Sequence, residues 1–246
     1  MTEQNEYREV LNERLCLTMR RGAPVTTVDA LLLAAFLPDA SKRACELGAG
    51  SGVISLLAAA RGKLSSALLI ERENTLASLC ERNVRDNGFH DILTVRHADL
   101  RECREFCEFD TVFANPPYRR ENDGTPAADP IADVARYERF GTIFDFCRIG
   151  AQMLVAGGRF CTVFPTRRRT ELCEAIAAAR LSPEREVTVY PYPSGNAKLL
   201  LLSAIKGKCD YKKESFTLCK EAGGEPTAAA RALYADGVLI TEGEKL

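Results

Sequence analysis

The stretch that decides the fold is ACELGAGSGVISLLAAAR, residues 44–61. A short apolar run ends at Leu47, glycines follow at positions 48, 50 and 52, and a second apolar run begins at Val53. Glycines let the backbone turn tightly and let a ligand approach the start of the next helix. The stretch therefore predicts a strand, a ligand-binding loop and a helix in succession.

Strand-like and helix-like runs continue to alternate after this stretch. Further strands are predicted at residues 67–71, 92–99, 109–118, 158–165, 184–190 and 198–205. Helices are predicted at residues 74–88, 142–154 and 169–180. This alternation predicts an α/β fold with a doubly wound, Rossmann-like, mostly parallel sheet, in which the last two strands form an antiparallel hairpin at one edge.

The domain organisation follows from the same pattern. We expect an N-terminal segment with a leading helix at residues 1–41, a core at residues 42–206 and an appendage of the same domain at residues 207–246. Residues 119–141 form a long polar stretch that fits no element, which is typical of a binding loop or a lid.

Bulk composition excludes several classes of protein. A net charge of −1 argues against a general polyanion binder, and no apolar run is long enough to cross a bilayer. The ten cysteines are scattered singly and no CxxC occurs, so we expect free thiols, no metal site and a cytoplasmic location.

Three acidic residues stand at the ends of three successive predicted strands: Glu46, Glu71 and Asp99. They suit a ligand with an ammonium group, a ribose and an adenine, whereas a pyrophosphate would be repelled. The expected cofactor is therefore S-adenosyl-L-methionine. The residues expected to bind it are Glu46, Gly48, Gly50, Gly52, Glu71, Arg72, Asp99, Leu100 and Asn115.

Each acid also has a structural alternative. Glu71 could pair with Arg72 or Arg82, and Asp99 could cap a helix that begins at Leu100. An NAD-binding protein is a further alternative, but the G-x-G-x-G spacing departs from the G-x-G-x-x-G of dinucleotide loops.

The tetrapeptide Asn115-Pro116-Pro117-Tyr118 ends the fourth predicted strand. Two prolines there end ladder hydrogen bonding, so the side-chain oxygen of Asn115 and the carbonyl of Pro116 are available as acceptors. Two acceptors suit an –NH₂ group, and Tyr118 offers a ring on which a planar substrate can stack. We expect Asn115, Pro116 and Tyr118 to be the catalytic residues of an N-methyltransferase.

With these two motifs the chain resembles the class I methyltransferases of the N-P-P-Y group, and among them the bacterial tRNA adenine-N6 methyltransferases that act beside the anticodon of a valine tRNA. Further segments that resemble this family are DALLLAAF (29–36), ERN (81–83), NG (87–88), RYE (136–138), GGRF (157–160), AK (197–198) and LY (233–234). The resemblance implies a seven-stranded sheet. It also implies that Glu46 and Glu71 lie near the methionine and ribose parts of the cofactor, Asp99 near its adenine, and Asn115 and Tyr118 near the target base.

The expected partner is tRNA. Arginines follow the fourth and fifth predicted strands, and parallel strands bring both clusters to the cofactor edge, where they could meet phosphates or lie on solvated helix starts. These arginines are Arg119, Arg120, Arg167, Arg168 and Arg169.

Two alternatives remain open from the sequence. A protein-glutamine N5 methyltransferase also presents an –NH₂ group to N-P-P-Y, but only about forty residues precede Cys45, too few for the helical domain of those enzymes. A non-catalytic RNA-binding scaffold would leave the three acids and the tetrapeptide without a purpose.

Overall fold

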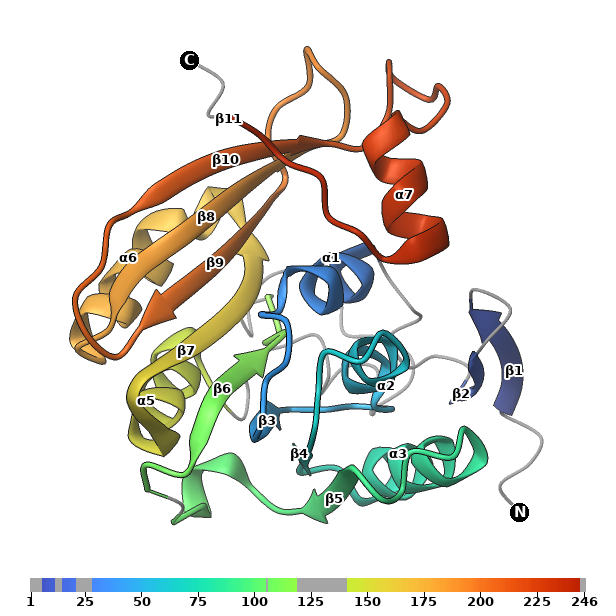
Figure 1. The fold of residues 1–246 in the computed structure, drawn as a ribbon, viewed down its shortest axis with the longest axis vertical. Helices are drawn as coiled ribbons and strands as arrows, with labels where there is room; N and C mark the ends of the chain where they lie inside the picture. Colours follow the sequence, from blue (N-terminus) through green and yellow to red (C-terminus); the bar gives the residue numbers. More distant parts are fainter. Residues whose placement is uncertain (1–5, 12–14, 21–27, 105, 119–140, 244–246) are drawn as a thin grey trace, which may run out of the picture.

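The structure, a computed structural model, describes residues 6–11, 15–20, 28–104, 106–118 and 141–243. Within these residues one large sheet has the strand order β11-β10-β8-β9-β7-β6-β3-β4-β5 (Figure 1). Its strands are β3 (Ala44–Leu47), β4 (Ala67–Glu71), β5 (Leu93–His97), β6 (Phe109–Ala114), β7 (Leu154–Pro165), β8 (Ser182–Tyr190), β9 (Leu199–Ile205), β10 (Lys212–Thr217) and β11 (Glu242–Gly243).

The seven strands from β5 to β8 have the predicted Rossmann-like arrangement. Strands β4, β3, β6 and β7 follow β5 in parallel pairs, and β9 runs antiparallel to both β7 and β8. The α/β fold, the parallel core and the antiparallel β8–β9 hairpin are therefore confirmed.

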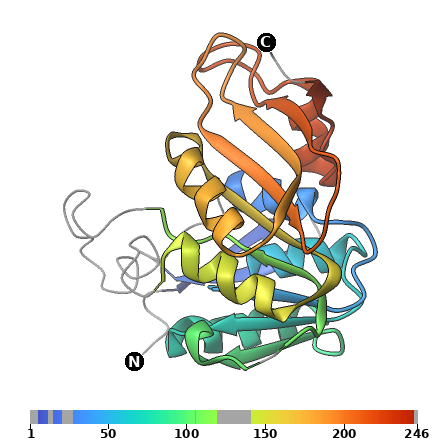
Figure 2. The same ribbon diagram turned by 90° about the vertical axis from the view of Figure 1, so that its left-hand side faces the viewer.

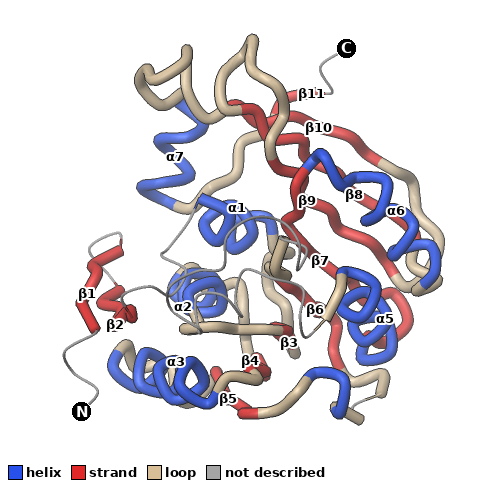
Figure 3. The backbone as a smooth tube through the Cα atoms, turned by 180° about the vertical axis from the view of Figure 1, so that it is seen from behind, coloured by secondary structure: helices blue, strands red, loops and turns tan. Residues whose placement is uncertain are grey.

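Helices cover both faces of this sheet (Figures 1 and 3). The helices are α1 (Val28–Phe36), α2 (Val53–Ala60), α3 (Asn74–Asp86), α5 (Ile143–Met153), α6 (Arg169–Ala178) and α7 (Ala228–Asp236). Helices α1, α2 and α3 bury one apolar cluster against one face, and α5 and α6 bury a second cluster against the other face, which Figure 2 turns toward the viewer. Helix α2 is apolar all round because it is enclosed by its neighbours, whereas α3 has one buried face and one exposed face.

The C-terminal residues extend the sheet, and this was not predicted. Strand β10 pairs in parallel with β8, and the short β11 pairs antiparallel with β10. The β8–β9 hairpin consequently does not form the outer edge of the sheet. The residues of KKESFT (212–217) are polar apart from Phe216, yet Glu214 and Ser215 are buried in this strand.

A second, two-stranded sheet precedes α1, in the N-terminal segment for which only a leading helix was predicted. It consists of β1 (Glu6–Leu11) and β2 (Leu15–Arg20), paired antiparallel. Helix α3 holds β2 through two asparagine side chains: Asn83 bonds the backbone of Thr18, and Asn87 bonds that of Cys16. Asn83 also donates to the carbonyl of Ser51 in the glycine loop, so the hairpin is tied to the start of α2.

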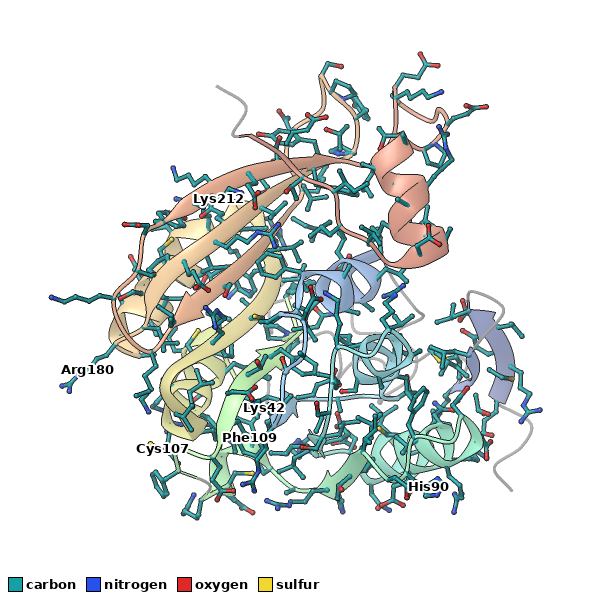
Figure 4. All side chains as sticks on the ribbon, in the orientation of Figure 1. Lys42, His90, Cys107, Phe109, Arg180 and Lys212 are labelled. Carbon is teal, nitrogen blue, oxygen red and sulfur yellow. The ribbon has the colours of Figure 1, made fainter. Side chains whose placement is uncertain are left out.

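The parallel strands all begin at one edge of the sheet and all end at the opposite edge. Lys42 and Phe109, labelled in Figure 4, mark the edge at which β3 and β6 begin. Leu47 and Ala114 end these strands as register partners, so Gly48 and Asn115 follow side by side at the opposite edge. Adjacent strands lie about 4.8 Å apart, which places the glycine loop and the Asn-Pro-Pro-Tyr motif next to each other.

Candidate active site

The loop between β3 and α2 has a backbone that requires glycine. Gly48, Gly50 and Gly52 have φ of +73°, +58° and +83°, in the left-handed region that side chains disfavour. A Cβ on Gly52 would also lie 2.6 Å from the Sγ of Cys80, whereas one on Gly50 would meet nothing within 4 Å. The loop therefore packs tightly on one side and leaves space beside Gly50.

Glu71 ends β4 and holds this loop. Its carboxylate accepts hydrogen bonds from the backbone N–H of Gly50 and of Glu73, both at 2.8 Å. The alternative pairing with arginine is not what the structure shows, because Arg72 pairs with Glu73 and Arg82 with Glu6. Burial raises the pKa of Glu71, and three backbone donors, those of Glu73, Gly50 and Arg72, lower it in part.

Glu46 is buried, with 1% of its surface exposed. Its carboxylate accepts a hydrogen bond from the hydroxyl of Ser55 on α2, and among the described residues no arginine or lysine forms an ion pair with it. Burial raises the pKa of Glu46 to about 8, and the nearby Glu71 adds to the rise. A buried carboxylate with no cationic partner is suited to receive a cationic group from a ligand.

Asp99 takes the structural role that the sequence left open as an alternative. Its carboxylate accepts from the backbone N–H of Arg101 and from that residue's guanidinium, and so caps a short 3₁₀ helix (Leu100–Glu102). The bonds from Arg101 lower the pKa of Asp99. Leu100 is buried beside it. An adenine amine at this point would have to compete with Arg101.

The Asn-Pro-Pro-Tyr motif follows β6 directly. Pro116 is buried and Asn115 is half-buried. The hydroxyl of Tyr118 donates to the side-chain oxygen of Asn115 and lies 3.3 Å from the carbonyl of Val163 on β7. The amide oxygen of Asn115 is thus an acceptor, and in the structure its donor is the hydroxyl of Tyr118.

Asp29, at the start of α1, is a further neighbour of Tyr118. Its carboxylate lies close enough to Tyr118 to interact with it, and burial raises the pKa of its carboxyl. The pKa of the Tyr118 hydroxyl is raised well above its usual value by burial and by the charge of Asp29. Tyr118 therefore remains a neutral hydrogen-bond donor across the physiological range.

The predicted arginine patch needs correction. Arg167 is exposed at the end of β7, but Arg168 is buried and paired with Glu171, and Arg169 is paired with Glu186. The guanidinium of Arg168 is therefore enclosed by the protein, whereas that of Arg169 is paired with a glutamate but 43% exposed. Arg119 and Arg120 lie outside the described residues.

A hollow of about 690 Å³ lies at the edge where the parallel strands begin, away from the glycine loop. It is found between the end of α1 and the start of β8. Its charged side chains are matched to one another: Arg159 binds Glu184 with two hydrogen bonds, and Lys63 pairs with Asp39. In the part of the chain that the structure describes, no group of three His, Cys, Asp or Glu side chains could hold a metal ion. No helix there is long and apolar enough to cross a membrane.

The model of the family described as "Methyltransferase small domain" matches residues 25–171. This chain belongs to that family. The tRNA1(Val) (adenine(37)-N6)-methyltransferase of Escherichia coli strain SE11 is 30% identical over 149 residues, 59% of this chain and 60% of the relative. The protein of the same name from Flavobacteriaceae bacterium strain 3519-10 is 28% identical over 182 residues, 73% of this chain and 76% of the relative. The chain spans about 60% of the length of the Escherichia coli and Shigella relatives that it matches.

Solved structures agree with the fold of a methyltransferase. A protein from Agrobacterium tumefaciens described as a predicted O-methyltransferase superimposes with a TM-score of 0.69 at 24% identity, over 86% of this chain and 97% of that one. The tRNA m1G37 methyltransferase of M. jannaschii superimposes with a TM-score of 0.59 at 11% identity, over 83% and 57%. At these identities the likeness concerns the fold alone.

Within this methyltransferase small domain, two residues of the site were not predicted from the sequence. Ser55 could have been noticed as the one hydroxyl in the apolar run VISLLAAA (53–60). Asp29 belongs to the segment that carries the family resemblance, but nothing in the sequence brings it to Tyr118, which lies about ninety residues later.

Proposed function

We propose that this chain transfers a methyl group from S-adenosylmethionine to the exocyclic N6 of an adenine in tRNA. The observation that carries the proposal is the register of β3 and β6, which sets the glycine loop beside the amide oxygen of Asn115 at one edge. A cofactor on the loop and an amine on Asn115 would then be neighbours.

The residues at this edge fit the cofactor. The space beside Gly50 admits a ligand close to the backbone, and the buried Glu46 offers a carboxylate to an ammonium group. Glu71 would receive the ribose hydroxyls, and Asp99 the adenine amine if Arg101 gives way. When bound, S-adenosylmethionine supplies a methyl group attached to a positively charged sulfur.

The protein's own contribution is to position the amine. The side-chain oxygen of Asn115 would accept one N–H of the substrate in place of the Tyr118 hydroxyl, which donates to it in the structure. Holding the hydrogens orients the nitrogen lone pair and favours the positive charge that grows on the amine during transfer. The lone pair is the nucleophile, so this scheme needs no strong base.

Adenine N6 of tRNA is favoured over a glutamine amide by the relatives at about 30% identity, whose names state that they act on tRNA1(Val). Arg167 is exposed after β7, on the same side of the sheet as Asn115, where a phosphate could be met. A glutamine amide presents the same –NH₂ geometry to Asn115 and is the second candidate.

A competition assay tests the proposal. The protein is incubated with S-adenosylmethionine labelled in its methyl group, together with bulk tRNA and a bacterial release factor in one tube. We expect the label in the tRNA fraction. Label in the release factor would favour the glutamine activity, and label in neither would contradict the proposed function.

A further inference from the structure

Arg168 contacts the Asn-Pro-Pro-Tyr motif from a distant part of the chain. It ends a short 3₁₀ helix (Thr166–Arg168) between β7 and α6, and only 8% of its side chain is exposed. One guanidinium nitrogen, Nη1, donates to the backbone carbonyl of Tyr118 at 3.0 Å. The other two, Nε and Nη2, donate to the carboxylate of Glu171 at 3.0 and 2.5 Å.

The same guanidinium also reaches Tyr118 through an aromatic ring. The guanidinium carbon of Arg168, Cζ, lies 5.0 Å from the ring centre of Phe164, near the end of β7. The Phe164 ring in turn meets the Tyr118 ring edge to face, with centres 5.7 Å apart and planes at 86°. Tyr118 is thus held at its backbone by Arg168 and at its ring by a side chain against which Arg168 packs.

Burying an arginine is costly unless its charge and its donors are matched. Glu171 matches the charge, and its position three residues along the chain, at the start of α6, keeps the guanidinium fixed. The planar fork of arginine can serve a carboxylate on one side and a carbonyl on another, which the single ammonium of lysine cannot reproduce. With Glu171 on its other side, the guanidinium directs Nη1 at the carbonyl of Tyr118.

We propose that Arg168, fixed by Glu171, is a positioning residue that sets the place of the Tyr118 ring and, through its hydroxyl, that of the Asn115 amide. This inference rests on the proposed function for its effect on turnover. It does not rest on it for the effect on Tyr118 itself, which can be observed without any substrate.

The neighbouring Arg169 provides a matched control. It also binds a glutamate through two nitrogens, with Glu186 at 3.2 and 2.9 Å, and it also stands at the start of α6. Arg169 also donates to the hydroxyl of Tyr211, which directly precedes β10, at 3.3 Å. Arg168→Met and Arg169→Met therefore remove the same chemistry, and only the first removes a contact with Tyr118.

The first measurement is steady-state methyl transfer to tRNA. Arg168→Met should lower kcat roughly 10- to 100-fold, because small misplacements of a positioned group have effects of this size. The KM for S-adenosylmethionine should stay within about twofold of the wild type, since the contacts described above for Arg168 are with Tyr118, Phe164 and Glu171. Arg169→Met should keep kcat, and Arg168→Lys, which retains a donor for the carbonyl, should recover part of the loss.

The second measurement is independent of activity. The protein is labelled with 3-fluorotyrosine, and the fluorine resonance of Tyr118 is assigned by its disappearance in Tyr118→Phe. Arg168→Met should shift this resonance, whereas Arg169→Met should leave it in place. Should Arg168→Met fail to fold, Glu171→Gln tests the same clamp, because it weakens the partner and leaves Arg168 present.

The outcomes separate the two proposals. A Tyr118 resonance unmoved in both Arg168→Met and Glu171→Gln, or a kcat equal to that of Arg169→Met, would overturn the positioning role. A shifted resonance in a protein whose wild type methylates no tRNA would support the clamp and contradict the proposed function.

Discussion

Glu46 lies near the edge where the parallel strands end, and Glu184 lies near the edge where they begin. The charges around these two carboxylates differ. Glu184, at the start of β8, receives two hydrogen bonds from Arg159 and one from Ser203, and these partners lower its pKa. Glu46, near the end of β3, is bonded by the hydroxyl of Ser55, and its pKa is raised to about 8 by burial.

The difference indicates that the surroundings of Glu184 stabilise the fold, whereas those of Glu46 suit the ligand that we propose. A carboxylate matched by arginine stabilises the folded chain, whereas a buried carboxylate without a cation destabilises it until a ligand supplies the charge. On this view, removing the charge of Glu46 or the side chain of Asn115 should cost little in stability and much in the proposed function. At the opposite edge the reverse should hold.

The largest effect is expected for Asn115→Ala. Removing the amide oxygen that would hold the substrate amine should lower the rate of methyl transfer about 10²- to 10³-fold, a typical loss for one preorganised polar group. Affinity for S-adenosylhomocysteine, measured by calorimetry, should change little. A variant that turned over near the wild-type rate would show that the motif is structural and would remove the functional half of the comparison.

Glu46→Gln should weaken S-adenosylhomocysteine binding by roughly 10- to 100-fold, the value of hydrogen bonds to a charged group. Glutamine keeps the size of the side chain and can still bond Ser55, so the loss reports the charge. Unchanged affinity would mean that Glu46 does not meet the ammonium group of the cofactor.

Glu46→Gln also tests how the stability of the ligand-free protein depends on pH. The folded-state pKa of Glu46 is about 8, above its ordinary value, so its contribution to the stability of the ligand-free protein is full at low pH. That contribution is lost as the pH rises toward and through 8. At pH 8 the ligand-free Glu46→Gln protein should therefore melt at a higher temperature than the wild type, and the gap should narrow near pH 5. A lower melting temperature at pH 8 would contradict the assigned cost of burying this carboxylate.

Arg159→Met tests the opposite edge. Loss of the bidentate pair with the half-buried Glu184 should lower the free energy of unfolding by about 1 kcal/mol at neutral pH. Because the folded pKa of Glu184 is lowered, this stabilisation is present above its ordinary pKa and fades as the pH falls. Methyl transfer and S-adenosylhomocysteine affinity should be unaffected, and a loss of activity larger than the loss of stability explains would break the comparison.

The smallest effect is expected for Arg167→Glu. This exposed side chain should account for about one phosphate contact, so tRNA affinity should fall a few-fold and the slope of log affinity against log salt should flatten by about one unit. Arg180→Glu is the control, because it makes the same charge change at an exposed position beyond the far end of α6 (Figure 4). Equal slopes in the two variants would remove Arg167 from the RNA-binding surface.

The sequence predicted the parts of this molecule that depend on local pattern. Glycine spacing and apolar runs predict the loop at Gly48–Gly52 and the alternation of strands and helices, and that alternation in turn implies the parallel core. Contacts between distant polar side chains leave no such pattern. Nothing in the run of arginines distinguishes Arg168, buried against Tyr118, from the exposed Arg167. The docking of β10 on β8 and of β2 on α3 depends in the same way on tertiary partners.

The central claim is that this edge of the sheet methylates an exocyclic amine held by Asn115. Its most direct test is nucleoside analysis by mass spectrometry of tRNA incubated with the wild-type protein and S-adenosylmethionine, with Asn115→Ala alongside. The account predicts new N6-methyladenosine with the wild type and a product reduced at least 100-fold with the variant. Methyl groups on ribose oxygens or ring nitrogens, or equal product from both proteins, would contradict it.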